Sequence, residues 1–312
     1  MPRLVSVGNV IVDIVMRIDA VPEPGGDTIA EGSEITAGGG LNTMVAARRD
    51  GMEVVFAGQY GTGPFADVVR AALAAEDIDV VQPGLPDVDS GYCVALVDAT
   101  TERTFVTSVG AEGRLTAADL GRVAVRDDDV VFVSGYGLAH PSNADAIVAW
   151  LGRLPEPTTV VLDPSPLVDT LRPDVLAAVL RRADVVSTNG REARLMSATS
   201  PDLADAAVRI AERCRGAAVV RDGAAGCWVA GPGRRTELVE GFRVAAVDTN
   251  GAGDAHDGVL AAALSRGDDL VTAARRANAA AAIAVTRRGP ATAPTAAEID
   301  ALLQGSGGAV SG

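Results

Sequence analysis

The chain contains no lysine: its 27 basic residues are all arginine. This absence excludes enzymes that depend on a lysine ammonium group, among them Walker A NTPases, protein kinases and Schiff-base enzymes. Any side-chain cation that holds a phosphate here must be an arginine guanidinium, which binds phosphate through two parallel hydrogen bonds.

Cysteine and aromatic residues are also scarce. The three cysteines, Cys93, Cys214 and Cys227, form no CxxC pair, so a reducing cytoplasm is the simplest interpretation. The N-terminal apolar run is broken by Asn9 and Asp13 and has no basic start, which predicts neither a signal peptide nor a membrane span. Two Trp, three Tyr and five Phe leave few flat surfaces on which a nucleobase could stack.

The charge balance is strongly acidic. The formal charge is −14 and the estimated pI is about 4.6, which argues against non-specific electrostatic binding to the phosphates of nucleic acids. The 312 residues, 48% of them hydrophobic, suffice for one large α/β domain or two small ones. We therefore expect small-molecule partners, with no nucleic acid and no membrane.

Helical segments alternate regularly with short apolar runs from Thr116 onward. The runs expected to be strands are 130–133, 160–162, 185–187 and 218–220, and they are rich in β-branched residues. This alternation predicts a mostly parallel sheet covered by helices on both faces. Ligands of such sheets bind at the carboxyl ends of the strands, where Asp163, Asn189 and Asp222 follow three of the runs.

The stretch 247–264 carries the most distinctive pattern in the chain. Gly251-Ala252-Gly253 stands directly before Asp254 and a helical run of small residues. Glycines let successive N–H groups face one point, and a helix N-terminus adds positive potential, so this is a candidate anion site. A carboxylate beside such a site suits phosphoryl transfer. A glycine-rich turn capped by Asp would look the same, and local chemistry alone leaves both interpretations open.

The pattern D-T-x-G-A-G-D followed by a short helix resembles the second signature of the ribokinase-like (PfkB) sugar kinases. The resemblance implies that Asp254 is the base that takes the sugar hydroxyl proton, and that the amides of Gly251, Ala252 and Gly253 form the anion hole. It also implies a ribokinase-like α/β fold over residues 1–312, with a mostly parallel central sheet flanked by helices and a small β-sheet lid from about 14–36 and 90–109. Family members usually carry an aromatic residue where this chain has His256.

A second stretch, A-G-G-G-L-N at 37–42, resembles the first signature of the family. Ala37 replaces the usual first glycine, while Gly38, Gly39 and Asn42 keep the register and are expected to bind the sugar. Asp13, in the preceding β-like segment, matches the family's carboxylate for sugar hydroxyls. Alone, a triple glycine indicates only a tight bend, and Asp13 alone only an exposed edge-strand charge.

The lid region departs from the family in the loop 58–64, G-Q-Y-G-T-G-P, which together with His256 indicates a subgroup distinct from true ribokinase. A closed lid excludes water and so limits wasteful ATP hydrolysis. Arg103, in the expected hairpin, is interpreted as a solvated strand charge in preference to a contact with an anionic substrate. Pairing of two copies through the lid would give a homodimer.

The resemblance places the nucleotide and metal sites on strand ends and on the last third of the chain. Asn189-x-x-Glu192 matches the family's N-x-x-E motif, and few carboxylates are needed because Mg²⁺ keeps several of its waters. Arg221 replaces the usual Thr or Lys of the nucleotide loop and is expected to clamp an ATP phosphate. The implied set is Asn189, Arg221, Gly223, Gly226 and Asn278 for ATP, Glu192 and Asp163 for Mg²⁺, partly through water, and Asp248, Asn250, Arg287 and Gly289 for a monovalent cation such as K⁺.

The leading hypothesis is an ATP-dependent kinase that phosphorylates a primary hydroxyl of a small sugar. A nucleoside kinase of the same fold is an alternative, with Tyr92, Phe105 and Tyr136 the best-placed aromatic residues. A non-catalytic sugar-binding regulator is a third hypothesis, although a binding module has no need of a base. For His256, a packed imidazole bonded to backbone or to the loop at Thr62 competes with a role in shaping the sugar pocket. The Gly/Ser segment 305–312 is expected to be a flexible tail.

Overall fold

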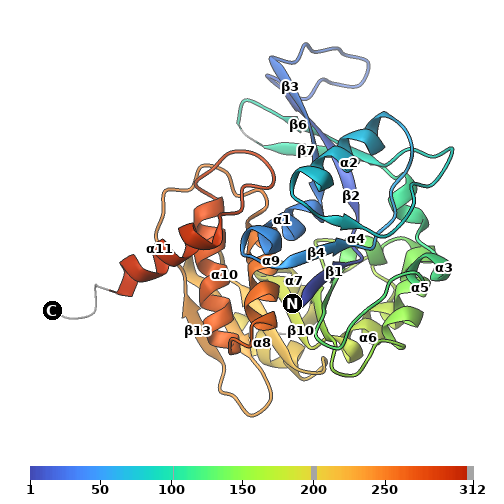
Figure 1. Cartoon of the computed structure of the whole chain (residues 1–312). Helices are drawn as coiled ribbons and strands as arrows, with labels where there is room; N and C mark the ends of the chain where they lie inside the picture. The colour runs from blue at the N-terminus through green and yellow to red at the C-terminus, as the bar shows by residue number, and fades with distance from the viewer. Residues whose placement is uncertain (101, 198–201, 308–312) are drawn as a thin grey trace.

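A nine-stranded sheet runs through the centre of the molecule in the computed structural model, which describes residues 1–100, 102–197 and 202–307 (Figure 1). Its order is β13-β12-β11-β10-β9-β8-β1-β4-β5, and only β12 and β13 at one edge are antiparallel. The strands are β1 (Arg3–Ser6), β4 (Glu53–Phe56), β5 (Asp79–Val80), β8 (Val130–Ser134), β9 (Thr159–Asp163), β10 (Val185–Asn189), β11 (Ala217–Arg221), β12 (Gly226–Ala230) and β13 (Glu237–Glu240). The mostly parallel sheet expected from the alternating pattern is therefore confirmed.

Helices cover both faces of this sheet and enclose two separate hydrophobic cores. One core lies under α1 (Leu41–Arg49), α2 (Pro64–Ala75), α9 (Ala252–Ser265), α10 (Leu270–Ala284) and α11 (Ala296–Gly307). The other lies under α3 (Ala117–Leu120), α4 (Gly135–Leu138), α5 (Pro141–Leu151), α6 (Pro173–Arg182), α7 (Gly190–Ser197) and α8 (Leu203–Ala211). In the described part of the chain, no helix combines the length and the apolar composition that a membrane crossing requires.

The C-terminal end corrects one expectation. The helix α11 continues to Gly307, so residues 305–307 are helical and do not belong to a flexible tail. Leu302 and Leu303 pack against the core, which anchors the last turns of the helix despite the glycines that follow. The remainder of the expected tail, 308–312, lies outside the described residues.

A four-stranded sheet forms the lid and stands apart from the central sheet, at the top in Figure 1. Its order is β3 (Gly32–Gly39), β2 (Val10–Arg17), β6 (Tyr92–Val97) and β7 (Arg103–Ser108). The turn at Gly8-Asn9 joins β1 directly to β2, so the lid is attached at the carboxyl end of a central strand. Because ligands of parallel sheets bind at that end, the lid stands over the expected site.

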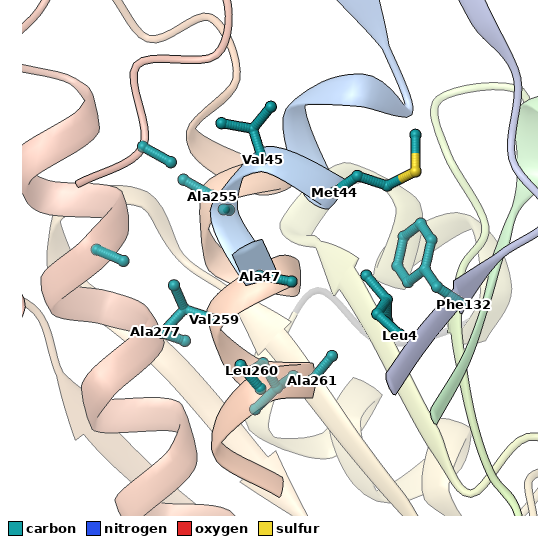
Figure 2. Close-up of a cluster of buried hydrophobic side chains, with 14 of the residues drawn as sticks. Leu4, Met44, Val45, Ala47, Phe132, Ala255, Val259, Leu260, Ala261 and Ala277 are labelled. Atoms are coloured by element: carbon teal, nitrogen blue, oxygen red, sulfur yellow. The ribbon is translucent and has the colours of Figure 1, made fainter. Parts of the chain in front are cut away.

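Helix α9 packs closely between α1 and α10, as the side chains in Figure 2 show. Its buried residues are mostly small, and a Cβ built on Gly258 would lie 2.3 Å from the Thr43 carbonyl oxygen and 2.7 Å from the Ala46 Cβ. Only a glycine at this position lets the two helix backbones approach so closely. The contact places the first turn of α9 beside the first turn of α1.

The substitution Gly258→Ala tests this contact. The added Cβ has no room against the α1 backbone, so we expect the free energy of unfolding to fall by about 1–3 kcal/mol or more. Urea or thermal unfolding measures the change. Gly152→Ala is the matched control, because Gly152 has a helical φ of −68° and its new Cβ would lie 3.8 Å from the Val148 and Ala149 carbonyl oxygens, an ordinary contact distance. Equal stability of the two variants would contradict the packing argument.

Candidate functional site

Polar side chains end four neighbouring strands at the edge of the sheet from which the lid rises. Ser134 ends β8 beside Asp163 at the end of β9, and Asn189 ends β10 beside Arg221 at the end of β11. Helix α9 begins at the same edge, since the carboxylate of its residue Asp257 contacts Arg221. The structure thus brings together groups that lie up to 123 residues apart in the sequence, from Ser134 to Asp257.

Asp254 lies in the first turn of α9 and is held by two residues of α1. Its Oδ2 accepts a hydrogen bond from Asn42 Nδ2 at 3.1 Å, and its Oδ1 accepts one from Thr43 Oγ1 at 3.0 Å. The Asn42 amide is itself oriented, because its Oδ1 accepts the Ala291 N–H at 2.9 Å. Asn42, expected to bind sugar, therefore also positions the Asp254 carboxylate, and Thr43 is a contact that the motif comparison missed.

A second carboxylate, Asp13 of the lid strand β2, shares the space in front of Asp254. Burial raises the pKa of Asp13 to about 6, and the negative charge of Asp254 adds to the rise. Burial likewise raises the pKa of Asp254, although the hydrogen bonds from Asn42 and Thr43 act against it. The two carboxylates that the sequence assigned to sugar binding and to proton removal therefore lie close enough for the charge of one to affect the pKa of the other.

The backbone geometry around Asp13 explains why the first signature needs its glycines. A Cβ on Gly38 would lie 2.0 Å from Oδ2 of Asp13, so any larger residue would displace that carboxylate. Gly39 has a φ of +64°, in the left-handed region that favours glycine, and the N–H of Gly40 donates to the Asn9 carbonyl at 2.8 Å. The tight bend and the expected sugar contact are therefore linked, because the absence of a side chain at Gly38 makes room for the Asp13 carboxylate.

The expected anion hole lies at the N-terminus of α9. Gly251 caps the helix with a φ of +73°, and the first-turn N–H groups have no acceptor within the helix itself. The Ala252 N–H makes a long hydrogen bond of 3.3 Å to the Thr249 carbonyl, so of the three expected donors it is the one already engaged. A Cβ on Gly253 would lie 3.5 Å from the Arg221 guanidinium, which places a positive charge directly beside these amides.

Arg221 is the centre of a buried charge cluster. Its Nη1 donates to Asp257 Oδ1 at 2.5 Å and to Ser187 Oγ at 2.9 Å, and its Nη2 donates to Asp163 Oδ2 at 3.3 Å. Glu192 Oε2 is 3.9 Å from the same Nη2. The guanidinium expected to clamp an ATP phosphate is thus engaged with protein carboxylates. Asp257 was not assigned from the sequence, although its i, i+3 spacing from Asp254 places the two on neighbouring positions of one helix face.

The cluster places three carboxyl groups, those of Asp163, Glu192 and Asp257, around the single guanidinium of Arg221. Burial raises the pKa of Asp163 well above its ordinary value, and the Arg221 charge only partly opposes this. Burial also raises the pKa of Glu192, against the hydrogen bond from the Asn189 amide. In addition, Oδ2 of Asp257 is buried and has no hydrogen-bond partner within the part of the chain that the structure describes. An excess of buried carboxylate oxygen fits a hard divalent cation such as Mg²⁺.

Direct ligation by many side chains is not arranged here. Among the described residues, no group of three or more His, Cys, Asp or Glu side chains is placed to hold a metal ion. Glu192 is buried and caps α7: its carboxylate accepts the Asn189 N–H at 2.8 Å and Asn189 Nδ2 at 2.6 Å. Such a donor set fits a cation that keeps most of its waters, as the N-x-x-E motif led us to expect.

Of the residues expected to bind the nucleotide, Gly223 borders open space, whereas Gly226 and Asn278 have packing roles. Gly223, with a φ of +56°, has open space around it on the loop after β11. Gly226 is required by packing, because its Cβ would lie 2.1 Å from the Val239 carbonyl. Asn278 is buried and ties α10 to the sheet edge, since its Nδ2 donates to the Val239 carbonyl at 2.9 Å. Gly226 and Asn278 therefore fix the packing of the chain beside the loop after β11, while the space around Gly223 on that loop stays open.

His256 lies with the buried charges and not at the lid loop. Its ring is 2% exposed, and Nδ1 is 3.5 Å from Asp257 Oδ1. Neither ring nitrogen has a hydrogen-bond partner among the described residues, and burial lowers the pKa of the imidazole. Thr62, the expected lid-loop partner, donates to the Leu85 carbonyl. The expected packed imidazole is confirmed by this burial, whereas the expected hydrogen bonds to backbone or to the loop at Thr62 are not formed among the described residues.

Arg103 is exposed, as expected, but its charge is paired. Its Nη2 donates to Asp248 Oδ1 at 2.9 Å, which joins the lid to the segment before α9. The Gly289 N–H donates to Asp248 Oδ2 at 3.3 Å, and the Arg287 side chain turns away to Glu298. Nothing in the residue pattern around Arg103 indicated this pairing, because its partner is 145 residues distant in the sequence.

Comparisons with known proteins agree with this geometry. A family model described as "pfkB family carbohydrate kinase" matches residues 1–297. The uncharacterized sugar kinase YegV of Escherichia coli strain K12 is 30% identical over 297 residues, covering 94% of this chain and 91% of that protein. The ribokinase of Thermotoga maritima has a TM-score of 0.82 at 22% identity, covering 97% of this chain and 100% of the other. A putative ribokinase II of Escherichia coli in complex with ATP and Mg²⁺ has a TM-score of 0.81 at 24% identity, covering 97% and 99%. The expected ribokinase-like fold is therefore confirmed.

The substitution Arg221→Met tests the buried cluster. Removing one partner of a buried ion pair typically costs about 3–5 kcal/mol, because the other charge is left without compensation. Asp257 is fully buried, so we expect Arg221→Met to lower the free energy of unfolding by that order. The double variant Arg221→Met, Asp257→Leu removes the stranded charge and should recover part of the loss in urea unfolding. A double variant no more stable than the single one would contradict the assigned pairing.

Proposed function

The chain belongs to the pfkB family of carbohydrate kinases, and from that premise we propose that it transfers the γ-phosphoryl group of ATP to a primary hydroxyl of a small sugar. Kinases of this family are phosphotransferases with alcohol acceptors. The observation that carries the proposal is the Asp254 carboxylate, which is held by Asn42 and Thr43 at the N-terminus of α9.

In the proposed reaction, the sugar lies between Asp13 and Asp254. Asp254 accepts the proton of the attacking hydroxyl, whose oxygen forms the new bond to the γ-phosphorus while the bond to the ADP oxygen breaks. The N–H groups at 251–253 and the adjacent Arg221 charge stabilise the negative charge that develops on the transferred group. The lid that carries Asp13 excludes water from the same space.

Asp163 and Glu192 would hold Mg²⁺, largely through water, at the negative edge of the cluster. Bound there, the ion neutralises charge on the phosphates of ATP. Asn189, Gly223, Gly226 and Asn278 form the proposed nucleotide side, in accord with their place around the ends of β10 and β11. Arg221 contributes its charge from beneath the anion hole.

One observation favours a nucleoside as the alternative acceptor. The rings of Phe65 and Tyr92 lie 4.8 Å apart near the start of β6, the strand next to Asp13, and Tyr136 on α4 is 42% exposed. Aromatic faces of this kind can stack on a nucleobase. A non-catalytic sugar-binding role is less well supported, because a binding module has no need of a positioned base such as Asp254.

Turnover with ATP on ribose, fructose, adenosine and pseudouridine tests the proposal. We expect a sugar to be phosphorylated in preference to either nucleoside, and Asp254→Asn to lower kcat by about 10²–10⁴-fold because the positioned base is lost. ATP affinity of the variant, measured by calorimetry, should be close to that of the wild type. Wild-type turnover in Asp254→Asn would remove the base from the mechanism, and a nucleoside preference would favour the alternative.

The pH dependence of kcat/KM gives a second test. Thr43 donates a hydrogen bond to ionised Asp254, so Thr43→Val should raise the pKa of Asp254 further. The base then stays protonated to higher pH, and the acid limb of the profile should move upward by about one to two pH units. Thr43→Ser keeps the hydroxyl and should leave the limb in place. A downward shift, or equal shifts in both variants, would contradict the assignment.

We further propose that two copies pair through their lids. Every residue of β7 is exposed, and Phe105 and Val106 present apolar side chains that are 60% and 63% exposed. Ile35 on β3 is 56% exposed on the same small sheet. Sedimentation of the wild type should give a dimer that Val106→Glu dissociates; a monomeric wild type would end this proposal.

A further inference from the structure

Arg103 and Asp248 form the ion pair that connects the lid to the catalytic end of the molecule. Arg103 is the first residue of β7, and Asp248 lies three residues before the helix cap Gly251. The side chains are 35% and 16% exposed, so the pair is partly shielded from solvent. Salt screens such a pair less than it screens a pair on an open surface.

The Asp248 carboxylate has a donor on each oxygen. Oδ1 accepts from Arg103 Nη2 at 2.9 Å and from the Asn250 N–H at 3.0 Å, while Oδ2 accepts from the Gly289 N–H at 3.3 Å. Burial acts to raise the pKa of Asp248, but these donors outweigh it and the pKa is lowered. The carboxylate is therefore ionised and already neutralised by the protein.

The same residue determines the path of the chain into the anion hole. The N–H groups of Val247 and Asp248 both donate to the Val285 carbonyl, at 2.7 and 3.1 Å. The bond from Asn250 to Asp248 then closes the turn that leads to Gly251. Asp248 thus joins three parts of the site: the lid, the loop after α10 and the segment that presents the anion-hole amides.

This donor set does not fit the monovalent cation that the family resemblance implies. Such a cation needs several oxygen atoms turned toward one point, whereas a guanidinium and two N–H groups are turned toward Asp248. A cation at this carboxylate would meet the Arg103 charge at close range, and like charges repel. Gly289 contacts Asp248 through its N–H, which likewise disfavours a cation beside that carboxylate oxygen.

We propose that the Arg103 guanidinium takes the place of a monovalent cation at Asp248 and makes this kinase independent of K⁺. Arg103 is a positioning residue: it holds Asp248, which in turn holds the turn before Gly251. Because Arg103 belongs to the lid, the charge stays in the protein and no ion has to be desolvated and captured. The inference rests on the proposed kinase activity, and one of its two tests does not require turnover.

The first test compares kcat/KM for the sugar in KCl and in tetramethylammonium chloride of equal ionic strength. The wild type should be the same in both salts within about twofold. Arg103→Met should lose about 10–100-fold in tetramethylammonium chloride, as expected when a hydrogen bond to a charged group is removed, and K⁺ should restore much of the loss. Arg103→Lys keeps the positive charge and should remain independent of K⁺. Arg209→Met, which removes a surface ion pair with Asp205 on α8, is the matched control and should behave as the wild type.

The second test measures cation binding directly by thermal unfolding in the same two salts. A ligand that binds only the folded state raises the midpoint temperature. The wild type should unfold at the same temperature in both salts, whereas Arg103→Met should be stabilised by K⁺. A wild type that K⁺ activates or stabilises would overturn the inference, as would an Arg103→Met variant that gains nothing from K⁺ in either test. If no substrate is turned over at all, the proposed function fails while the thermal test still decides on Arg103.

Discussion

The close contact between α1 and α9 is the constraint on which the rest of the site depends. Asn42 and Thr43 lie more than 200 residues before Asp254, yet both bond its carboxylate because Gly258 allows the two helix backbones to meet. The first turn of α9 also carries the amides of the proposed anion hole, and Asp257 follows Asp254 by three residues on the same helix. A shift of α9 relative to α1 would therefore move the proposed base, the phosphate site and the buried charge cluster together.

Charge compensation by arginine is the second organising feature. The chain has no lysine, and its arginines take both of the critical positions: Arg221 among the buried carboxylates, and Arg103 on Asp248. A planar guanidinium suits these places because it donates in several directions at once and stays charged when buried. At Arg221 the carboxylates still outnumber the cation, which leaves the negative edge that suits Mg²⁺. At Asp248 one guanidinium and two amides satisfy the carboxylate fully.

Sequence patterns predicted the features that depend on residues close together in the chain. Alternating apolar runs predicted the parallel sheet, and the two glycine motifs together with the β-like segment of Asp13 predicted that Asp13, Asn42 and Asp254 lie close together. The pattern was wrong at 305–307, where packing of Leu302 and Leu303 extends α11 beyond the point at which composition favours disorder. A cytoplasmic location, the lid-mediated dimer and the role of Asp254 as base stay predictions.

The sequence by itself determined the family, the order of strands and helices and the residue types available for phosphoryl transfer, because periodicity and turn chemistry act over a few neighbouring residues. Only the tertiary structure decided which groups meet. It turned Arg221 toward Asp257, paired Arg103 with Asp248 and buried His256 beside the charge cluster. These side chains find their partners across helices and sheets that are distant in the chain. Their pairing follows from close packing and from the free-energy cost of a buried charge without a partner, and neither is visible in a local motif.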